Sequence, residues 1–425
     1  MAVTESAPPA TAPPVTVWHD RLSARMRGMK SSAIRELLKL TTRAEVISFA
    51  GGLPAPDFFP WQEIEAATDR ILETRGKEAL QYSTTEGFLP LRELLVRHMA
   101  RYGIEVQAGN VLITSGSQQA LDLVGKLLIN PGDRVVVEDP SYLGALQAFT
   151  AYQPEFLTVP VDEGGIDTER LEVALRSGPK FVYVLPNFQN PSGVTLSLER
   201  RRRVIELASH YGVPIVEDDP YGQLRYEGSH LPPLVVLDAE FHGTGNHVHA
   251  YRGDLIYLGT LSKTLAPGLR IGWVVAPEEV VDKLVQLKQG ADLHTATFTQ
   301  MVAWETARGG FLDRHVRRLR EVYRERRAAM LDALERHFPP GVQWTRPQGG
   351  LFLWVTMPPP LDSARMLPRA LEAGVAYVPG HSFHALGGGE GSMRMNFSYC
   401  PPEVIEEGVR RLGGVIAREM AACAT

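Results

Sequence analysis

Residues 259–273 read GTLSKTLAPGLRIGW, and this stretch decides how the rest of the chain is interpreted. A single lysine, Lys263, stands among hydroxyl side chains, and Arg270 follows it. An amine that forms a Schiff base with an aldehyde must be unprotonated part of the time, and a desolvated site beside cations lowers a lysine pKa towards that state. A guanidinium suits a phosphate group. The stretch therefore predicts a site for a small molecule that carries both an aldehyde and a phosphate.

Two further features of this stretch fit such a site. Thr260 and Ser262 add hydroxyl donors, and Pro267-Gly268 turns the chain so that both ends of the loop face one pocket. The alternative is a strand at residues 255–258 that leaves a sheet through a polar loop with an incidental lysine. Other segments are needed to decide between these interpretations.

In two segments that precede this stretch, an apolar run is followed by a polar turn. Residues 111–120, VLITSGSQQA, are typical of a strand, a turn of small residues and the start of a helix. The free backbone N–H groups and the dipole of such a helix start favour an anion. Residues 138–143, EDPSYL, place Tyr142 just past the next strand. Taken alone, Tyr142 is equally an ordinary tyrosine at a strand end.

Two later segments repeat this pattern. Residues 186–193, PNFQNPSG, follow an apolar run, and Asn190 is held extended because a proline comes next. Residues 215–222, IVEDDPYG, end a buried strand in acids that include Asp218, with Tyr221 three residues later. Acids at strand ends are often helix caps, so this signal is weak alone and gains its weight from its order with Lys263.

The last segment lies near the C-terminus. Residues 392–398, SMRMNFS, alternate as a strand does, so Arg394 and Asn396 point away from Met393 and Met395. A single arginine in a strand is usually a solvated charge at the sheet edge. In this order, however, the segments resemble those of the fold-type I pyridoxal-phosphate enzymes, class I/II aminotransferases, from about Ile47 to the C-terminus.

The resemblance implies pyridoxal 5'-phosphate as cofactor and a role for each matched residue. Lys263 would carry the cofactor covalently and move the substrate proton. Arg394 would grip the substrate α-carboxylate, and Gly52, in residues 48–57, would let backbone approach the substrate. The implied cofactor-binding residues are Ser117, Gln118, Thr260, Ser262 and Arg270 at the phosphate, Tyr142 stacked on the ring, Asp218 at the pyridine nitrogen, Asn190 and Tyr221 at the phenolic oxygen, and Tyr82 from the other subunit of a homodimer.

Within that family the chain is most similar to the 2-aminoadipate and kynurenine aminotransferase group. The similarity lies in residues 31–40, SSAIRELLKL, in residues 51–55, GGLPA, and in residues 288–295, KQGADLHT. It implies that Ser32 and Arg35 lie on an N-terminal lid helix and that Arg35 pairs with a distal carboxylate of the substrate. The expected amino donors are 2-aminoadipate, glutamate, leucine or aromatic amino acids, with 2-oxoglutarate as acceptor. The alternative for Arg35 is a surface arginine on an amphipathic helix.

The order of apolar runs predicts an α/β fold. Between Val111 and Val275 short apolar runs alternate with helical stretches, as in a largely parallel sheet with helices on both faces. The resemblance implies a mostly parallel seven-stranded sheet and a smaller α/β C-terminal domain, whose sheet we expect at residues 350–355, 376–378 and 393–397. The expected divisions are a disordered tail at 1–16, an N-terminal arm at 17–50, a large cofactor-binding domain at 51–300 and a small domain at 301–425.

Composition excludes several classes of protein. The 425 residues hold 44 Lys+Arg and 49 Asp+Glu, and this near balance gives no reason to expect nucleic acid or an anionic membrane as a partner. Two cysteines are too few for a disulfide framework, and the histidines show no metal-ligand spacing. The first sixteen residues lack the pattern of a signal or transit peptide, so we expect a cytoplasmic enzyme that binds amino and oxo acids.

Two other functions use the same cofactor. One is a non-catalytic sensor domain of the kind fused to transcription regulators, for which we would expect a basic winged-helix domain ahead of Ile47. The other is a different reaction, such as decarboxylation or acyl transfer, because the ring and the lysine are common to all of them. The sequence favours the aminotransferase over both.

Overall fold

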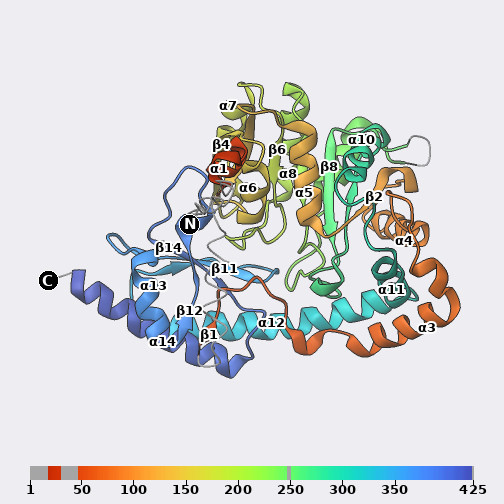
Figure 1. The fold of residues 1–425 in the computed structure, drawn as a ribbon. Coiled ribbons are helices and arrows are strands. Elements are labelled where there is room, and N and C mark those ends of the chain that lie inside the picture. Colours follow the sequence, from red (N-terminus) through yellow and green to blue (C-terminus); the bar gives the residue numbers. More distant parts are fainter. Residues whose placement is uncertain (1–17, 30–45, 247–249, 424–425) are drawn as a thin grey trace, which may run out of the picture.

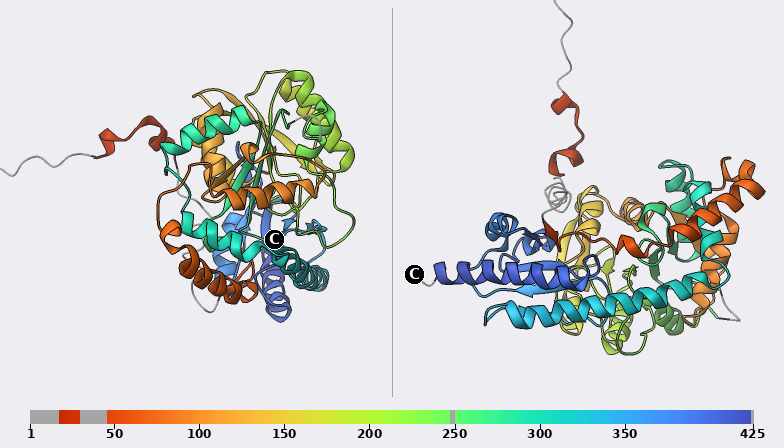
Figure 2. Two further views of the ribbon diagram at one scale, coloured as in Figure 1. Left: turned by 90° about the vertical axis from the view of Figure 1, so that its right-hand side faces the viewer. Right: turned by 90° about the horizontal axis from the view of Figure 1, so that it is seen from below.

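The computed structural model describes residues 18–29, 46–246 and 250–423. The expected tail at 1–16 and half of the expected arm, with Ser32 and Arg35, lie outside these residues. The short helices η1 (Trp18–Arg21) and α1 (Ala24–Gly28) project from the body of the molecule in both views of Figure 2.

The largest sheet in the described part has the strand order β2-β9-β8-β7-β6-β3-β4-β5. The pairings from β8 to β4 are parallel, whereas β9 runs antiparallel to both of its neighbours and β5 antiparallel to β4. Its strands are β2 (Val111–Thr114), β3 (Arg134–Asp139), β4 (Glu155–Asp162), β5 (Gly165–Ile166), β6 (Val182–Val184), β7 (Ile215–Asp218), β8 (Leu255–Thr260) and β9 (Gly272–Val275).

The prediction of a mostly parallel α/β sheet is confirmed, but the expected count of seven strands is wrong. The eighth is β5, whose two residues turn back on the end of β4 through a tight turn. A two-residue strand leaves no period of alternating apolar residues in the sequence, so the pattern that reveals the longer strands could not reveal this one.

The sheet is apolar on both faces because helices cover both of them (Figure 1). Neighbouring residues of one strand enter different cores: Leu255 and Tyr257 of β8 face one core, while Ile256 and Leu258 face the other. The helices around the sheet are α4 (Leu89–Ala100), α5 (Ser117–Leu128), α6 (Leu143–Thr150), α7 (Thr168–Leu175), α8 (Leu198–Tyr211), α9 (Leu234–His242), α10 (Glu278–Gln289) and α11 (Thr297–Ala307). A further helix, α3 (Trp61–Ala79), lies beside them.

A second layer of structure is built from the C-terminal part of the chain. Its sheet has the order β10-β11-β14-β13, and it packs in one apolar core with two long helices that lie along it in Figure 1. These elements are α12 (Phe311–His337), β10 (Gln343–Trp344), β11 (Phe352–Thr356), α13 (Ser363–Glu372), β13 (Val378–Pro379), β14 (Ser392–Asn396) and α14 (Pro402–Cys423).

The predicted strand at residues 376–378 is divided between two sheets. Tyr377 separates β12 (Val375–Ala376) from β13, and β12 pairs in parallel with β1 (Ile47–Ser48) in a small sheet of its own. The segment near residue 50 is therefore attached to the C-terminal layer, and it enters the junction between that layer and the large sheet. Short 3-10 helices complete the described elements: η2 (Pro56–Phe58), η3 (Ala108–Asn110), η4 (Pro267–Leu269) and η5 (Gly380–Phe383).

Two features are absent from the described residues. No helix there is long and apolar enough to cross a membrane. In the same residues, no group of three or more His, Cys, Asp or Glu side chains is arranged to hold a metal ion.

Candidate functional site

A cavity of about 370 Å³ lies where the carboxyl ends of the parallel strands meet β11 and β14. Loops after strand ends converge there, as is usual for ligand sites in α/β sheets. Its lining residues are Gly52, Ser117, Gln118, Tyr142, Leu185, Asn190, Asp218, Pro220, Tyr221, Thr260, Ser262, Lys263, Pro267, Arg270, Phe352 and Arg394. The structure thus brings together most residues that the sequence singled out, although they come from distant parts of the chain.

Lys263 follows β8 and projects into this cavity. It is partly exposed to the cavity but otherwise lies deep among protein atoms, and this burial lowers its pKa to about 8, with Arg394 and Arg270 acting in the same direction. Its Nζ donates a hydrogen bond of 2.8 Å to the carbonyl of Gly52. A usable fraction of this amine is therefore unprotonated near neutral pH, as a nucleophilic lysine requires.

Asp218 ends β7 and is held by a residue that the sequence reasoning missed. Oδ2 accepts a hydrogen bond of 2.8 Å from the hydroxyl of Tyr183 on the neighbouring strand β6. Oδ1 is buried, has no hydrogen-bond partner among the described residues, and belongs to a carboxyl that lines the cavity. Burial raises the pKa of Asp218 to about 7, which the hydrogen bond from Tyr183 opposes.

Tyr183 left little signal in the sequence. It stands inside an apolar run, where a tyrosine is most simply a core residue, and it does belong to a buried apolar cluster. Its contact with Asp218 depends on the parallel pairing of β6 with β7, which sequence spacing does not give. Burial and Asp218 raise the pKa of Tyr183 well above its usual value, so its hydroxyl remains a donor.

Arg270 lies beside the turn that begins α5. It adopts a left-handed backbone conformation, with φ 53° and ψ 44°, which is uncommon for a residue with a side chain and is often found at functional sites. A Cβ added to Gly116 would meet the Arg270 guanidinium, and one added to Gly272 would lie 2.6 Å from the backbone of Gly116. Glycine at both positions lets β9, the turn and the guanidinium approach one another closely, which makes a cationic cradle at a helix N-terminus.

Two hydroxyls on the loop after β8 are linked to each other. Thr260 Oγ1 and Ser262 Oγ lie 2.9 Å apart, and Thr260 donates to the carbonyl of Ile271 at 3.0 Å. The single proton of Thr260 can serve either of these acceptors, and when Thr260 donates it to Ser262 Oγ, the hydroxyl proton of Ser262 is left for a ligand.

The turn at the start of α5 is supported from behind by an ion pair whose lysine is buried. Lys288 is fully buried, and its ammonium lies 2.6 Å from the carboxylate of Asp292. Asp292 accepts further hydrogen bonds from Ser115 at 3.1 Å and from the amide of Gln119 at 2.8 Å. The segment at residues 288–295 therefore fixes the turn that carries Ser117 and Gln118.

Arg394 on β14 is one of the most completely buried side chains of the protein. Nη1 donates to Asn190 at 2.9 Å and Nη2 to the carbonyl of Ala50 at 2.7 Å. Its guanidinium stacks 4.2 Å from the ring centroid of Phe352 and 5.1 Å from that of Phe383. Burial lowers the pKa of Arg394 to about 10, so the side chain is cationic at neutral pH and is aimed at the cavity by aromatic rings.

Tyr142 and Tyr221 occupy the walls of the cavity, and Tyr82 does not reach it. Burial raises the pKa of Tyr142 to about 12 and that of Tyr221 above its usual range, so both hydroxyls stay protonated. Tyr82 is 78% exposed, and among the described residues its ring is paired with that of His294, at a centroid distance of 5.8 Å. Within one chain, Tyr82 therefore contributes nothing to the cavity.

The geometry supports a particular chemistry. A basic amine, a carboxylate oxygen without a partner, a cationic cradle and a second buried arginine surround one cavity, with aromatic rings on its walls. These groups would fit a planar ring that bears a basic nitrogen, a carbonyl and a phosphate, next to a carboxylate that faces Arg394.

Comparison with known proteins supports this interpretation. The family model for aminotransferase class I and II matches residues 52–412. An aromatic-amino-acid aminotransferase of Thermococcus litoralis is 48% identical over 414 residues, which cover 96% of each chain, and a 2-aminoadipate transaminase of Thermus thermophilus is 47% identical over 93% of this chain and 96% of that one. The crystal structure of an α-aminoadipate aminotransferase from Thermus thermophilus, complexed with N-(5'-phosphopyridoxyl)-L-leucine, superposes with a TM-score of 0.88 at 44% identity and covers 96% of this chain and all of that one.

The lowered pKa of Lys263 can be tested in cofactor-free protein. Acetylation of Lys263, followed by peptide mass mapping, should rise through about pH 8, where an ordinary lysine is still almost fully protonated. Arg394→Gln removes a neighbouring cation and should move the midpoint to higher pH. The exposed Lys77 serves as the internal reference. A midpoint for Lys263 near that of a free lysine would contradict the desolvation of this amine.

Proposed function

The chain belongs to the class I and II aminotransferases, which are pyridoxal-phosphate-dependent transaminases, and we propose that it moves an amino group from an L-amino acid to a 2-oxo acid such as 2-oxoglutarate. One observation carries the proposal: the amine of Lys263, with its lowered pKa, lines the same cavity as the partnerless oxygen of Asp218. An amine that must attack a carbonyl and a carboxylate that must meet a ring nitrogen are the two groups this reaction needs.

The lining residues fit pyridoxal 5'-phosphate. Arg270, Ser262 and the N-terminus of α5 at Ser117 and Gln118 would hold the phosphate, with Thr260 supporting Ser262. Oδ1 of Asp218 would accept a hydrogen bond from the protonated pyridine nitrogen, and Tyr142 would stack on the ring. Because the oxygen of Asn190 is engaged by Arg394, its amide NH₂ would face the phenolic oxygen together with the hydroxyl of Tyr221.

The cofactor, when bound, supplies an aldehyde that accepts the amino group and a ring that withdraws electrons from the substrate Cα. The residues of this chain do the rest. Arg394 binds the α-carboxylate and thereby orients the Cα–H bond, and the Nζ of Lys263 takes the Cα proton and returns it. Asp218 keeps the ring nitrogen protonated, and Tyr183 keeps Asp218 in place.

The substrate class is a finer proposal. The names of the relatives include aromatic amino acids, 2-aminoadipate and kynurenine, and the solved structure of the aminoadipate enzyme carries a leucine adduct. These names support a pocket that accepts acidic, aromatic and branched apolar side chains, through the expected lid. Ser32 and Arg35 lie outside the described residues, so the role of Arg35 at a distal carboxylate rests on sequence resemblance.

A homodimer with shared active sites is also proposed. Tyr82 is exposed on the loop after α3 rather than turned into its own cavity, and several large apolar side chains on α3, on the loop after it, at the start of α4 and at residue 293 are exposed as well. These are Trp61, Leu72, Leu80, Leu89 and Leu293. Exposed apolar patches mark interaction surfaces, so we propose these side chains as candidates for the contact between subunits.

The reaction itself is tested by product analysis. An amino acid labelled with ¹⁵N, such as leucine, is mixed with unlabelled 2-oxoglutarate and the cofactor-loaded protein. We expect labelled glutamate and the 2-oxo acid of leucine in equal amounts, and no product with Lys263→Ala. Loss of carbon dioxide or cofactor binding without exchange of the amino group would instead support a decarboxylase or a sensor domain.

The pair of Asp218 and Tyr183 should control the acid side of the pH profile. Asp218→Asn should lower turnover by at least about a hundredfold, because the ring nitrogen loses its charged partner. Tyr183→Phe removes a hydrogen bond that lowers the pKa of Asp218, so this pKa should rise. When the pH is lowered, the variant should therefore lose activity at a higher pH than the wild type does. The control is Tyr152→Phe, a hydroxyl bonded to Asp122 outside the cavity. An unshifted acidic limb in Tyr183→Phe would refute the positioning role.

Shared sites predict complementation between inactive chains. A Lys263→Ala chain mixed with a Tyr82→Ala chain should form hybrid dimers with one intact site, and activity should recover to as much as about a quarter of the wild-type value per chain. A mixture of Lys263→Ala with Asp218→Asn is the matched control, since no hybrid of these two has an intact site. Full activity of a protein that sediments as a monomer would contradict the shared site.

Substrate breadth is tested with two arginine variants. Arg394→Ala should reduce catalytic efficiency for 2-aminoadipate, glutamate, leucine and phenylalanine alike, because each presents an α-carboxylate. Arg35→Ala should reduce it only for the two acidic substrates, by about tenfold to a hundredfold, as expected for one charge-assisted pair. Arg365→Ala, at an exposed arginine on α13, controls for the loss of charge. An equal loss of catalytic efficiency for all four substrates in Arg35→Ala would show that Arg35 shapes the lid and does not bind the substrate side chain.

A further inference from the structure

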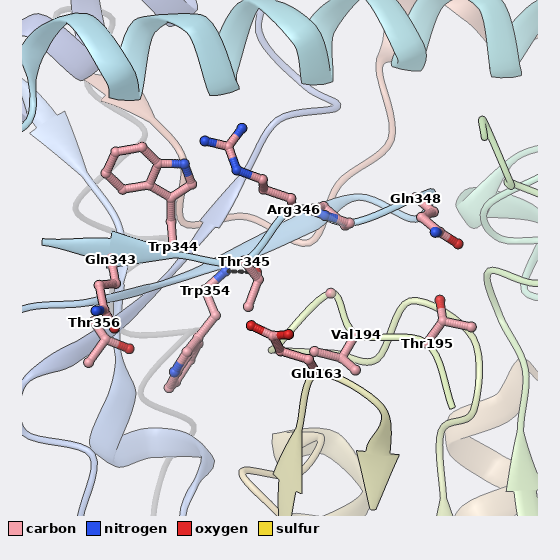
Figure 3. Close-up of a pocket in the computed structure, with 12 residues that line it drawn as sticks. Glu163, Val194, Thr195, Gln343, Trp344, Thr345, Arg346, Gln348, Trp354 and Thr356 are labelled. Atoms are coloured by element: carbon pink, nitrogen blue, oxygen red, sulfur yellow. Dashed lines mark hydrogen bonds between the residues drawn. The ribbon is translucent and has the colours of Figure 1, made fainter. Parts of the chain in front are cut away.

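A second cavity, of about 560 Å³, lies along β11, towards the end of the strand away from the candidate active site, and Figure 3 shows the residues that line it. One wall comes from the turn between β4 and β5, at Glu163, and from residues 193–195. The opposite wall comes from β10, the chain that follows it, and β11. We call this space the rear groove; its volume is in the range of sites for small molecules.

The side chains that face the rear groove are of two kinds. Trp354 is half-buried, so part of its indole is accessible, and Glu163 is exposed and forms no ion pair with a described residue. The adjacent Asp162, by contrast, is bound by Arg200. In Figure 3 Trp354 and Glu163 extend into the same space between the sheet and the turn.

The one basic side chain of the rear groove is engaged elsewhere. Arg346 extends towards α12 in Figure 3 and is paired with Glu335. The charge left at the groove is therefore the carboxylate of Glu163, next to an aromatic face. A carboxylate and an indole together attract an organic cation, through charge and through the cation–π interaction.

The rear groove and the candidate active site share β11 as a wall. Phe352 and Trp354 are two residues apart, so they lie on the same face of the strand. Phe352 lines the first cavity and stacks on Arg394, whereas Trp354 lines the second. Trp354 also packs edge-on against Phe383 at 5.6 Å, and Phe383 is the second ring beside Arg394.

The loop after β6 is a second shared wall. Its Asn190 accepts a hydrogen bond from Arg394 in the first cavity, while Gly193 and Thr195 line the rear groove. Thr345, on the opposite wall of the groove, donates a hydrogen bond of 2.7 Å to the carbonyl of Ser192. A ligand between these walls would press on the supports of Arg394 from two sides.

We propose that the rear groove binds a small organic cation between Glu163 and Trp354, and that its occupation changes the affinity of Arg394 for carboxylate ligands. The coupling runs through the rings of Trp354 and Phe383 and through the loop at Ser192. By reciprocity, a carboxylate bound at Arg394 changes the affinity of the groove for the cation by the same factor.

Choline is the probe, because its quaternary nitrogen cannot react with the aldehyde of the cofactor. Titration calorimetry of the cofactor-loaded protein should show saturable binding of choline, and binding should be at least about threefold to tenfold weaker for dimethylbutanol, in which carbon replaces the charged nitrogen. Glu163→Gln and Trp354→Leu should each weaken choline binding by a similar factor. Glu169→Gln, at another exposed glutamate, should leave it unchanged.

The coupling is measured with glutarate, a carboxylate that cannot donate or accept an amino group. Saturating choline should change its dissociation constant by at least about twofold in wild type and not in Glu163→Gln. No saturable binding, or equal binding of choline and its uncharged isostere, would overturn the cation site. Binding without any effect on glutarate would overturn the coupling. Neither arm depends on amino transfer, so the two proposals can fail separately.

Discussion

Desolvation of two opposite charges at the ends of neighbouring parallel strands is the constraint on which the site depends. Burial lowers the pKa of Lys263 and raises that of Asp218, so the same environment makes the amine more nucleophilic and the carboxylate more basic. In water neither shift would occur. The fold therefore prepares both groups by placing them after β8 and β7, where helices cover both faces of the sheet and the loops close over the strand ends.

Support from behind is as important as the groups that line the cavity. Tyr183 holds Asp218, the ion pair of Lys288 and Asp292 holds the turn before α5, and Phe352 and Phe383 flank Arg394. Tyr183, Lys288 and the two phenylalanines are themselves buried. Buried polar groups with full sets of partners keep a site in one conformation, whereas the free oxygen of Asp218 is left for a ligand.

The sequence predicted the lining residues better than their supports. Lys263, Asp218 and Arg394 stand at strand ends or alternate along a strand, and such positions are legible from apolar runs and turn residues. Tyr183 and Phe383 could not be found in this way, because their contacts depend on the pairing of β6 with β7 and on the packing of η5 beside β14, neither of which follows from sequence spacing. The sequence likewise did not reveal that residues 375–379 are divided between two sheets, or that β5 exists. Strands of two residues are too short to show an alternation of apolar and polar residues.

The hydrogen bond from Lys263 to the carbonyl of Gly52 joins the large sheet to the segment that follows β1. A lysine nitrogen that is bonded to another group has fewer protons to donate. The hydrogen bond to Gly52 therefore weakens whenever the Lys263 nitrogen forms such a bond. Gly52 and Ala50, whose carbonyl Arg394 holds, belong to the same short segment. The chemical state of the Lys263 nitrogen thus helps to decide how firmly residues 50–52 are held against the large sheet.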